Sequence, residues 1–550
     1  METALFHRAD GYAIYFFSEN GGQMWKPDGE VKERLAITKR GVDNYPTEWE
    51  LRTEDDSVEV YDHLGRLVSI RFKNGTSQTL FYSDAATPLA IASQPNLLIE
   101  VKNNFGASLQ FAYDSAGMLY KMLDPAGNEY LYTYDSLGNF TNVTYPTGLR
   151  RFYHYDEAAH TTPVASNGLL TGISDELTAG NIVRYSFYKY KDTFPIATEH
   201  GNGVDKYTFD YANSTVTDPL GATRGYTYTS VNGRKVQNGK TQRATPASPV
   251  QYSTTALDAN GNVTTREGFN GEKTCLIYDT VRNLETVRAE GLGRNDYCYY
   301  ALNDTTLTLP VQKTSTSWHA TLRMPLVIAS PLLRTTYTYD ATGNVTTRTE
   351  QPTSDATGVK GFAAVNMGGA RQWKYTYNTE GQLLTVTGPR TDVIDKTSYT
   401  YDIKGNLETV TTAALHVTKM SNYDAHGRVG RILEPSGVAT DLTYTPRGWL
   451  ATSTVSNQGL RQVTSYDYDG AGQLTTVTRP DGSYASYTYD NARRLTDIAD
   501  NIGNRIHYTL DNVGNRIKEE VRDPTGVLSL QTTRQYDPLN RLQSVTGGAQ

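Results

Sequence analysis

The chain of 550 residues carries a formal net charge of −7, and 38% of its residues are hydrophobic. Because the charge is modest and no run of lysine and arginine is present, the sequence lacks the basic patch typical of nucleic-acid-binding proteins. No apolar stretch is long enough for a transmembrane helix, and residues 1–5 lack the basic and apolar regions of a signal peptide. We therefore expect no nucleic-acid partner, no transmembrane segment, and synthesis in the cytoplasm without a signal peptide.

Tyrosine dominates the aromatic residues: the sequence has 40 Tyr and only 14 Phe, with a mean hydropathy of −0.53. A compact two-layer sandwich of this length would bury a broad dry core. A single-layer sheet that is wet on both faces instead needs aromatic rings whose hydroxyl groups can reach water or a neighbour. The composition therefore favours a long sheet around a wet interior, and we expect it to coil or close because flat open edges promote aggregation.

Residues 1–60 precede the repetitive part of the chain. An aromatic run ends at Phe17, and Trp49-Glu50-Leu51 leads into Val58-Glu59-Val60-Tyr61-Asp62. We interpret 1–60 as lead-in strands of the same sheet.

Residues 61–300 and 337–550 are built on one repeated motif, Tyr-Asp-x-x-Gly, followed two places later by a large apolar residue. Tyr113, Tyr134 and Tyr155 follow one another at steps of 21 residues. A fixed period of this length is typical of repeat proteins, in which each unit packs only against its neighbours. We predict a structural role for the motif residues in the seven complete copies: Tyr61, Asp62, Gly65, Tyr113, Asp114, Gly117, Tyr134, Asp135, Gly138, Tyr339, Asp340, Gly343, Tyr401, Asp402, Gly405, Tyr423, Asp424, Gly427, Tyr468, Asp469 and Gly472.

Each repeat is predicted to be two short strands and two turns. In the motif turn, the Asp carboxylate can accept a hydrogen bond from the backbone N–H two residues on, and Gly supplies a positive φ. The second turn has the form Asp-Pro-x-Gly, as in 124–127, where Pro presets φ. Between the turns, tyrosines alternate with other residues, so that Tyr130, Tyr132 and Tyr134 share one face. The fold class is therefore all-β, a long antiparallel sheet of hairpin repeats.

Two segments interrupt the repeat. Residues 301–336 include the locally apolar run 322–329. We interpret this segment as an insertion, either a buried strand or plug under the sheet or a site that docks cargo or a partner. Residues 351–371 are rich in Gly and Ala and are predicted to form a surface loop.

The two cysteines, Cys275 and Cys298, are 23 residues apart, which is about one repeat. They could therefore lie on neighbouring hairpins. Because disulfides are rare in a reducing cytosol, we expect two unpaired thiols.

Motifs that carry chemistry are missing from the sequence. The histidines are scattered singly, without a metal-binding spacing, and no nucleophile elbow is present. Asp467, Asp469 and Gly470 come nearest to a calcium loop but fit an ordinary turn. The stretch 233–241 has one residue too many between its glycines for a phosphate loop. We expect no catalytic, cofactor-binding or metal-binding residues, and no enzymatic activity.

The motif, its spacing and the Asp-Pro-x-Gly half-turns resemble the Rhs/YD-repeat family over nearly the whole chain, most clearly at 55–156 and 337–545. Members of that family are large bacterial proteins, with animal teneurins as relatives, whose repeats spiral into a hollow β-shell. In bacterial members the shell commonly encloses a variable C-terminal toxin that a secretion system or a toxin complex delivers. The resemblance implies a structural shell segment that encapsulates a toxin polypeptide, is made in the bacterial cytoplasm and is delivered to a target cell as part of a larger protein.

The sequence departs from the family pattern in two ways. Bacterial members end the shell with a plug that carries an autoproteolytic Asp-Pro-x-Gly site, whereas here residues 523–526 precede another repeat at 536–542. An ordinary half-turn therefore explains 523–526 better than a cleavage site. The chain stops in mid-repeat without a toxin-like tail, so we expect a shell segment that lacks the toxin domain.

Two other functions stay open. Exposed tyrosines could stack on sugar rings or on a protein partner, which would make the chain an adhesion or glycan-binding protein. The location of Tyr132, Tyr339 and Tyr401 distinguishes this binding function from the shell. Rings that face outside favour binding, and rings that face inward or pack between turns favour the shell. An autoprotease that cleaves near Asp523 is the third possibility, and the intact mass of the protein tests it.

Overall fold

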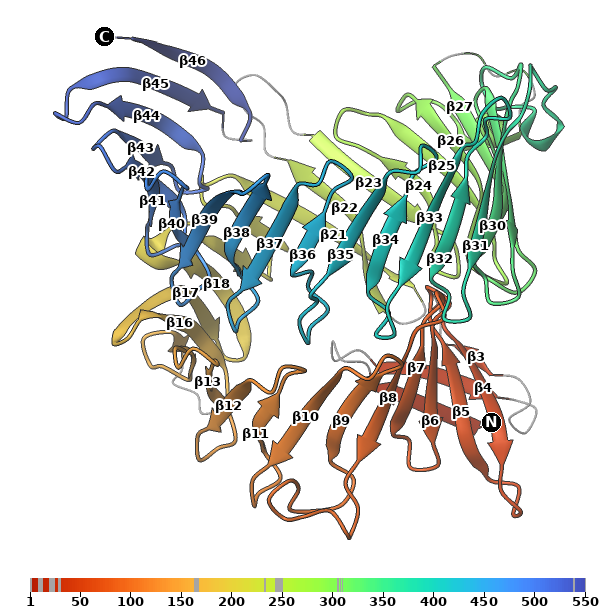
Figure 1. Cartoon of the computed structure of the whole chain (residues 1–550). Coiled ribbons are helices and arrows are strands. Elements are labelled where there is room, and N and C mark those ends of the chain that lie inside the picture. Colours follow the sequence, from red (N-terminus) through yellow and green to blue (C-terminus); the bar gives the residue numbers. More distant parts are fainter. Residues whose placement is uncertain are drawn as a thin grey trace.

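The computed structural model describes residues 2–7, 13–18, 25–27, 31–162, 168–231, 234–242, 251–303, 306, 308, 310–537 and 540–549. Nearly all the regular secondary structure of these residues is β-strand, and most of the strands belong to one long antiparallel sheet (Figure 1). The all-β hairpin sheet predicted from the repeat is therefore confirmed.

A small separate sheet lies at the N-terminal end. Its strands are β1 (Glu2–His7), β2 (Ala13–Ser18) and β3 (Lys26–Pro27). The expectation that all of 1–60 belongs to the main sheet is wrong for these strands. The reason is that apolar side chains such as Phe16 in β2 pack face to face on Leu35 and Leu51 of the main sheet, instead of continuing its ladder.

The main sheet runs from β4 to β46, and its strands pair with their neighbours in the sequence. The first part comprises β4 (Arg34–Arg40), β5 (Pro46–Arg52), β6 (Val58–Asp62), β7 (Leu67–Arg71), β8 (Ser77–Tyr82), β9 (Leu98–Asn103), β10 (Ser108–Tyr113), β11 (Leu119–Leu123), β12 (Glu129–Tyr134), β13 (Phe140–Thr144), β14 (Arg150–Tyr155), β15 (Thr161–Thr162), β16 (Leu170–Thr178), β17 (Asn181–Lys191), β18 (Phe194–His200), η1 (Gly201–Gly203), β19 (Tyr207–Asp210), β20 (Thr215–Thr217), β21 (Thr223–Val231), β22 (Arg234–Gln242), β23 (Gln251–Leu257), β24 (Val263–Glu267), β25 (Lys273–Asp279) and β26 (Leu284–Leu292). The short strand β15 departs from the order, because it pairs in parallel with β17 while β14 pairs with β16.

The second part of the sheet follows the short helix α1 (Cys298–Asn303). It comprises β27 (Gln312–Trp318), β28 (Pro325–Ser330), β29 (Leu333–Tyr339), β30 (Val345–Pro352), η2 (Gly361–Ala363), β31 (Arg371–Tyr377), β32 (Leu383–Thr387), β33 (Lys396–Tyr401), β34 (Leu407–Thr411), β35 (Val417–Ser421), β36 (Arg431–Leu433), β37 (Ala439–Tyr444), β38 (Leu450–Asn457), β39 (Leu460–Tyr468), β40 (Leu474–Thr478), β41 (Tyr484–Tyr489), β42 (Leu495–Asp500), β43 (Arg505–Leu510), β44 (Arg516–Arg522), β45 (Leu528–Tyr536) and β46 (Leu542–Ala549).

Residues 301–336 interrupt the motif but not the sheet. Strand β27 pairs with β26, and β28 pairs with both β27 and β29. Within its described residues this segment therefore contributes strands to the main sheet, and its role as an insertion stays a prediction. Its apolar run forms a ladder strand, because a sheet that packs on one face tolerates apolar side chains without the turn motif. Of the segment 351–371, residues 353–370 connect β30 to β31, with the exposed side chains Phe362, Val365 and Met367.

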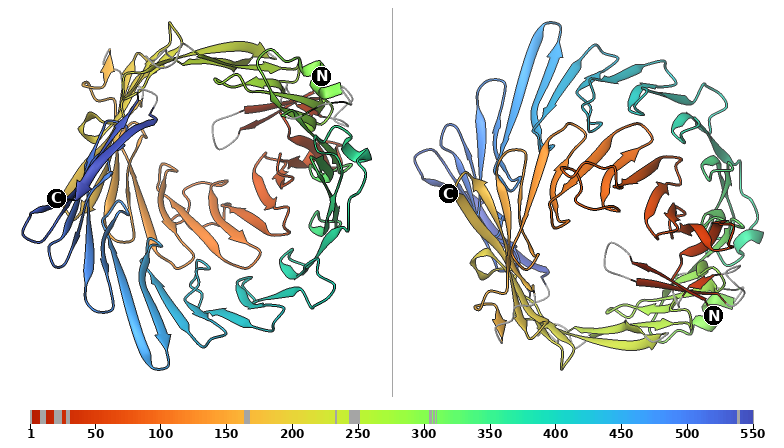
Figure 2. Two further views of the ribbon diagram at one scale, coloured as in Figure 1. Left: turned by 90° about the horizontal axis from the view of Figure 1, so that it is seen from above. Right: turned by 90° about the horizontal axis from the view of Figure 1, so that it is seen from below.

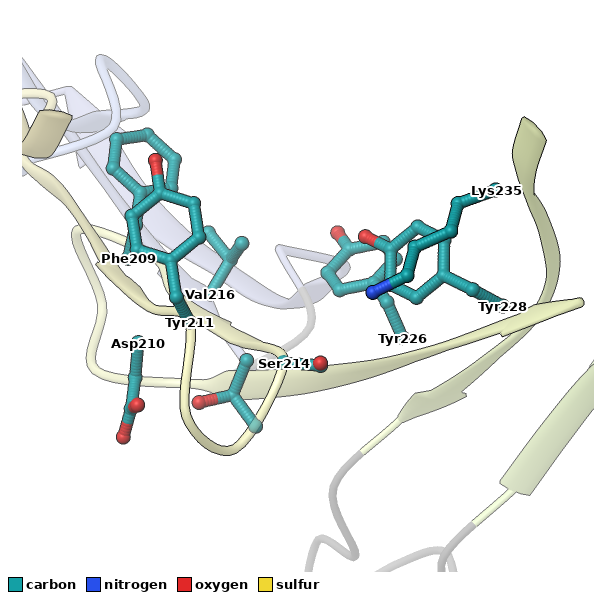
Figure 3. Close-up of a pocket in the computed structure, with 9 residues that line it drawn as sticks. Phe209, Asp210, Tyr211, Ser214, Val216, Tyr226, Tyr228 and Lys235 are labelled. Atoms are coloured by element: carbon teal, nitrogen blue, oxygen red, sulfur yellow. The ribbon is translucent and has the colours of Figure 1, made fainter. Parts of the chain in front are cut away.

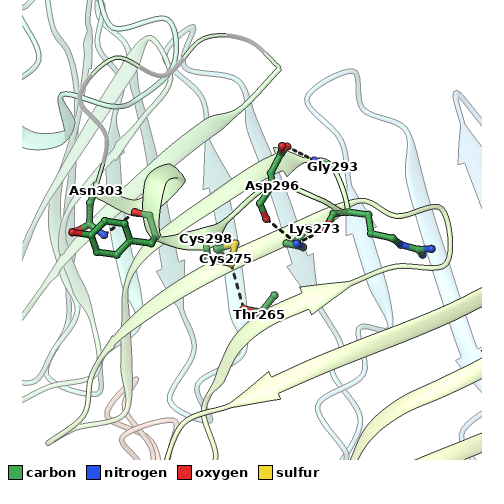
Figure 4. The surroundings of a disulfide bond; sticks show 9 residues. Thr265, Lys273, Cys275, Gly293, Asp296, Cys298 and Asn303 are labelled. Atoms are coloured by element: carbon green, nitrogen blue, oxygen red, sulfur yellow. Dashed lines mark hydrogen bonds between the residues drawn. A yellow bond between two sulfur atoms is a disulfide. The ribbon is translucent and has the colours of Figure 1, made fainter.

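The two cysteines form a disulfide, which corrects the expectation of unpaired thiols (Figure 4). Cys275 lies in β25 and Cys298 opens α1, and their Cα atoms are 5.5 Å apart. Strand β26 returns the chain by one hairpin, so a separation of about one repeat places the two residues side by side. Cys275 is fully buried in a small cluster with Ala289, Leu292 and Ala301.

The sheet coils around an open interior (Figure 2). Within the described strands, β4 pairs with β5 and β46 with β45, and no ladder joins the two ends of the sheet. The ladder shifts register immediately before motif tyrosines such as Tyr113, Tyr134 and Tyr401. Irregularities of this kind bend a strand and increase its twist, so their repetition curves the sheet in one direction.

Candidate functional site: the motif turns, the inner face and the seam

The motif aspartate organises each motif turn. In the turn at Asp135, Oδ1 accepts hydrogen bonds from the backbone N–H groups of Leu137 and Asn139, both 2.9 Å, and Oδ2 accepts one from the Asn139 side chain. Gly138 donates its N–H to the Asp135 carbonyl and has a φ of 83°. The same pair of backbone bonds to Oδ1, from the second and fourth residues beyond, forms at Asp62, Asp114, Asp340, Asp402, Asp424 and Asp469.

Every motif glycine has a positive φ and closes its turn with a hydrogen bond to the aspartate carbonyl; these residues are Gly65, Gly117, Gly138, Gly343, Gly405, Gly427 and Gly472. The turn therefore uses the two groups that define the motif, the carboxylate as acceptor and the glycine as the residue free of a Cβ.

These contacts change the acidity of the aspartates. The hydrogen bond from Asn139 lowers the pKa of Asp135. At Asp402 burial acts to raise the pKa, but the hydrogen bonds from Asn406 outweigh it and the pKa is lowered. Asp469 is the contrary case, because burial raises its pKa above the ordinary value.

The motif tyrosine connects one repeat to the one before it. Tyr134 donates its hydroxyl to the carbonyl of Leu119 at 2.9 Å, and Tyr423 donates to Leu407 at 2.6 Å. Both acceptors are the apolar residues that stand two places after a motif glycine. The same bond forms from Tyr113 to Leu98, from Tyr339 to Pro325 and from Tyr401 to Leu383.

Two motif tyrosines differ from this pattern. Tyr61 donates to Glu59 Oε2 at 2.6 Å, and the ring of Tyr468 packs on Trp449 with centroids 5.3 Å apart. Sequence reasoning assigned the tyrosines to strand alternation and missed the inter-repeat bond. The recurring offset of about fifteen residues between an apolar residue after a turn and the next tyrosine, as between Leu119 and Tyr134, was the available signal.

Burial of these rings shifts their titration. The pKa of Tyr134 and that of Tyr401 are raised, chiefly by burial. Burial raises the pKa of Tyr339 to about 12, with a smaller contribution from Tyr337. The hydroxyls therefore stay protonated donors well above neutral pH.

One face of the sheet lines the interior of the coil, and we call it the inner face. Figure 2 shows β1 and β2 inside the coil, where Phe16 packs with Leu35 and Leu51 of the main sheet. Tyr61 belongs to the same face, because its ring centroid lies 5.1 Å from that of Phe6 in β1. Since the motif recurs in register along the sheet, the face that bears the motif tyrosines is the inner face.

The tyrosines named as discriminators lie on this face and are packed. Tyr339 and Tyr401 are half-buried and hydrogen-bonded to the preceding repeat. Tyr132, also half-buried, has its ring 5.8 Å from Phe140 and its hydroxyl 3.8 Å from Met122 Sδ. The alternate residues, such as Thr133, are exposed on the opposite, outer face.

Distant parts of the chain meet where one turn of the coil lies against the next, and we call this contact the seam. In Figure 1 its lower side runs from the strands at β6 to those at β18. His426 Nε2 lies 2.9 Å from Asp124 Oδ2, across 302 residues of sequence. Further seam hydrogen bonds join Arg323 N to Asp56, Gly470 N to the Leu177 carbonyl and Asp205 N to the Asn512 carbonyl.

Two arginines of the upper turn stack on tyrosines of the lower turn. The guanidinium carbon of Arg447 is 3.6 Å from the ring centroid of Tyr145, and that of Arg493 is 3.6 Å from the ring of Tyr185. Arg493 also forms an ion pair with Asp175. Burial lowers the pKa of Arg447, and it lowers that of Arg493 to about 10. The seam therefore includes two arginines enclosed between the two turns, besides the hydrogen bonds that join its backbone and carboxylate groups.

A hollow of about 430 Å³ opens beside β19 to β22 (Figure 3). Its lining residues are Phe209, Asp210, Tyr211, Ser214, Thr215, Val216, Tyr226, Tyr228 and Lys235, and we call it the Tyr211 hollow. Tyr211 and Tyr228 are 55% and 51% exposed, unlike the packed motif tyrosines.

No group of three or more potential metal ligands is found among the described residues. Within that same part of the chain, no helix is both long and apolar enough to cross a membrane.

A coiled, repeat-built sheet with a tyrosine-lined interior defines a shell-forming repeat domain. The family model described as Teneurin YD-shell matches residues 91–357 and 359–547, and the chain therefore belongs to this YD-shell family. The expected Rhs/YD-repeat relationship is confirmed. Comparison with curated proteins gives no match.

Solved structures show the same fold. The crystal structure of TcdB2-TccC3-Cdc42 is similar to this chain with a TM-score of 0.59 and 14% identity, over 90% of this chain and 27% of the other. The structure of TcdB2-TccC3-TEV gives 0.56 and 14% over 92% and 28%, and that of TcdB2-TccC3 gives 0.54 and 13% over 98% and 31%. This chain thus spans less than a third of the length of the chains that it matches.

Proposed function

We propose that this YD-shell domain is part of a larger shell that encloses a toxin polypeptide, with the toxin domain itself lying outside residues 1–550. The observation that supports the proposal best is the coil around an open interior whose inner face carries packed tyrosines. Such a lining offers hydroxyls and ring edges rather than a continuous apolar surface, so an unfolded chain can be held by many weak contacts without irreversible binding.

The shell would act by containment and not by catalysis. The aspartates that fill its turns are occupied by backbone N–H groups, as at Asp135 and Asp402. We propose that the domain has no enzymatic activity, that it is made in the bacterial cytoplasm and that delivery machinery carries it to a target cell within a larger protein. A glycan-binding role has less support, because Tyr339 and Tyr401 are turned inward and hydrogen-bonded.

Native proteolysis of the whole natural gene product tests the proposal. Trypsin is added to the intact protein and, as a control, to the protein unfolded in urea, and the fragments are identified by mass spectrometry. We expect a polypeptide from outside 1–550 to survive digestion of the native protein and to co-elute with the shell. A gene product whose remaining sequence is digested as fast in the native state as in urea, or that has no further sequence, would overturn encapsulation.

A further inference from the structure

The Tyr211 hollow lies on the inner face of the sheet. Tyr211 donates its hydroxyl to the Pro195 carbonyl at 2.9 Å, which is the same backward bond that the motif tyrosines make. Phe209 is paired with Val216 across β19 and β20, and Ser230 with Lys235 across β21 and β22. Since paired residues share a face, the rings and Lys235 project to one side of the strands (Figure 3).

The rings of the hollow are free to bind. At 55% and 51% exposure, Tyr211 and Tyr228 leave much of their ring surface uncovered, although Tyr211 leans on Phe194 with centroids 5.5 Å apart. In Figure 3, Tyr211 stands at one side of the hollow and Tyr226 and Tyr228 at the other. Two separated aromatic walls can take a planar ring between or against them.

The hollow is lined by one cation, Lys235, and one carboxylate, Asp210. Lys235 is exposed and lines the hollow together with Tyr226 and Tyr228. Among the described residues, no carboxylate forms an ion pair with Lys235. Asp210 points away from the rings, and its carboxylate accepts hydrogen bonds from Asn213 N and Nδ2. The hollow therefore offers one unpaired cation and no competing anion among its rings.

We propose that the Tyr211 hollow binds an extended peptide segment in which an aromatic residue is flanked by acidic residues. The inference rests on the proposed function, since the segment would belong to the enclosed polypeptide. The aromatic residue stacks on Tyr211 and Tyr228, and a neighbouring carboxylate pairs with Lys235. The volume of about 430 Å³ suits one large side chain with its neighbours and is too small for a folded unit.

Peptide titration of the full chain of 550 residues tests this site. The probe is a fluorescein-labelled peptide Asp-Glu-Trp-Glu-Asp, followed by fluorescence anisotropy, with Asp-Glu-Ala-Glu-Asp and Lys-Lys-Trp-Lys-Lys as controls. We expect the first peptide to bind at least about tenfold more tightly than either control, which is the loss expected for one stacked ring or one charge pair.

Matched variants localise the binding. Tyr228→Ala and Lys235→Glu, both at exposed positions, should each weaken binding of the acidic Trp peptide by about tenfold. Tyr252→Ala and Lys374→Glu change residues of similar exposure in β23 and β31 and should leave binding unchanged. Circular dichroism verifies that each variant is folded.

Three outcomes would overturn the site: equal binding of all three peptides, binding that Lys235→Glu leaves intact, and absence of binding by the acidic Trp peptide. None of them bears on proteolytic protection of an enclosed chain. Failure of this site and failure of encapsulation are therefore separate results.

Discussion

At the scale of single residues, the motif works because each of its side chains has a distinct hydrogen-bonding partner. The aspartate binds the backbone of its own turn, whereas the tyrosine binds the carbonyl of the repeat before it. The aspartate thus holds the backbone conformation of its own turn, and the tyrosine holds neighbouring repeats at a fixed distance. That division explains why the two residues recur together.

Removing one tyrosine hydroxyl should weaken this connection without disturbing the ring. Tyr401→Phe loses the 2.9 Å bond from its hydroxyl to the Leu383 carbonyl. We expect the free energy of unfolding to fall by about 1 kcal/mol, measured by urea denaturation. Tyr252→Phe, which alters an exposed ring, is the control and should have no effect. Equal losses in the two variants would show that the inter-repeat bond does not contribute.

The raised pKa values of the buried tyrosines predict a loss of stability in alkali. The ordinary pKa of tyrosine is about 10, and burial raises that of Tyr339 to about 12. Because the folded pKa is higher, the stabilisation is complete below about pH 10 and disappears as the pH rises through the folded values. The thermal midpoint, followed by circular dichroism from pH 9 to 12.5, should therefore fall steeply above about pH 10. A midpoint that stays constant to pH 12 would contradict the burial of these hydroxyls.

At the scale of the element, the hairpin is what the sequence predicts best. Turn residues and alternating tyrosines define the strands, so the hairpins at Asp135 and Asp402 could be read directly. The ladder through β27 and β28 could not be predicted from the motif, because an antiparallel ladder needs only alternating backbone bonds and no particular side chains. The disulfide was not predicted either, because disulfides are rare in a reducing cytosol. The structure shows that strand β26 brings the chain back so that Cys298 lies beside Cys275.

The disulfide should stabilise its own repeat and little else. It closes a separation of 23 residues, and a loop of that size constrains the unfolded chain by about 3 kcal/mol in the entropic model. In Cys298→Ser, we expect hydrogen exchange to accelerate in β25, β26 and α1, with strands such as β41 and β42 unchanged. Wild-type protein in reducing agent should show the same pattern. Uniform acceleration across the sheet would mean that the repeats unfold as one unit.

At the scale of the whole molecule, the seam joins residues that are far apart in the sequence, and the repeat pattern alone does not predict such contacts. A repeat protein is expected to couple only neighbours, yet His426 contacts Asp124 across 302 residues. Contacts of this kind depend on the curvature of the sheet, which accumulates over many repeats and which no single turn encodes. The sequence therefore predicts the hairpin repeat and the sheet that it forms. The curvature of the whole coil determines which distant repeats come into contact at the seam.

Two glycines with similar backbones separate the effect of the seam from that of the turn. Gly405 has a φ of 77°, and an added Cβ would lie 2.6 Å from the ring of Phe105 on the neighbouring turn of the coil. Gly437 has a φ of 84°, and no atom lies within 4 Å of its added Cβ. We therefore expect Gly437→Ala to lower the free energy of unfolding by about 1 kcal/mol, through backbone strain alone. Gly405→Ala should lower the free energy of unfolding by about 1–3 kcal/mol more than Gly437→Ala does, because of overpacking. Urea denaturation measures both values.

Opening the seam should expand the coil while its strands stay intact. Arg447 and Arg493 each stack on a tyrosine of the neighbouring turn, and Arg493 also pairs with Asp175. In Arg447→Ala/Arg493→Ala, these attractions are lost, but every ladder bond between sequence neighbours is kept. We expect small-angle X-ray scattering to give a larger radius of gyration than wild type, with unchanged far-ultraviolet circular dichroism. Arg461→Ala and Arg479→Ala, which alter exposed arginines, should scatter as wild type does. Equal radii for all variants would mean that strand curvature alone holds the turns together.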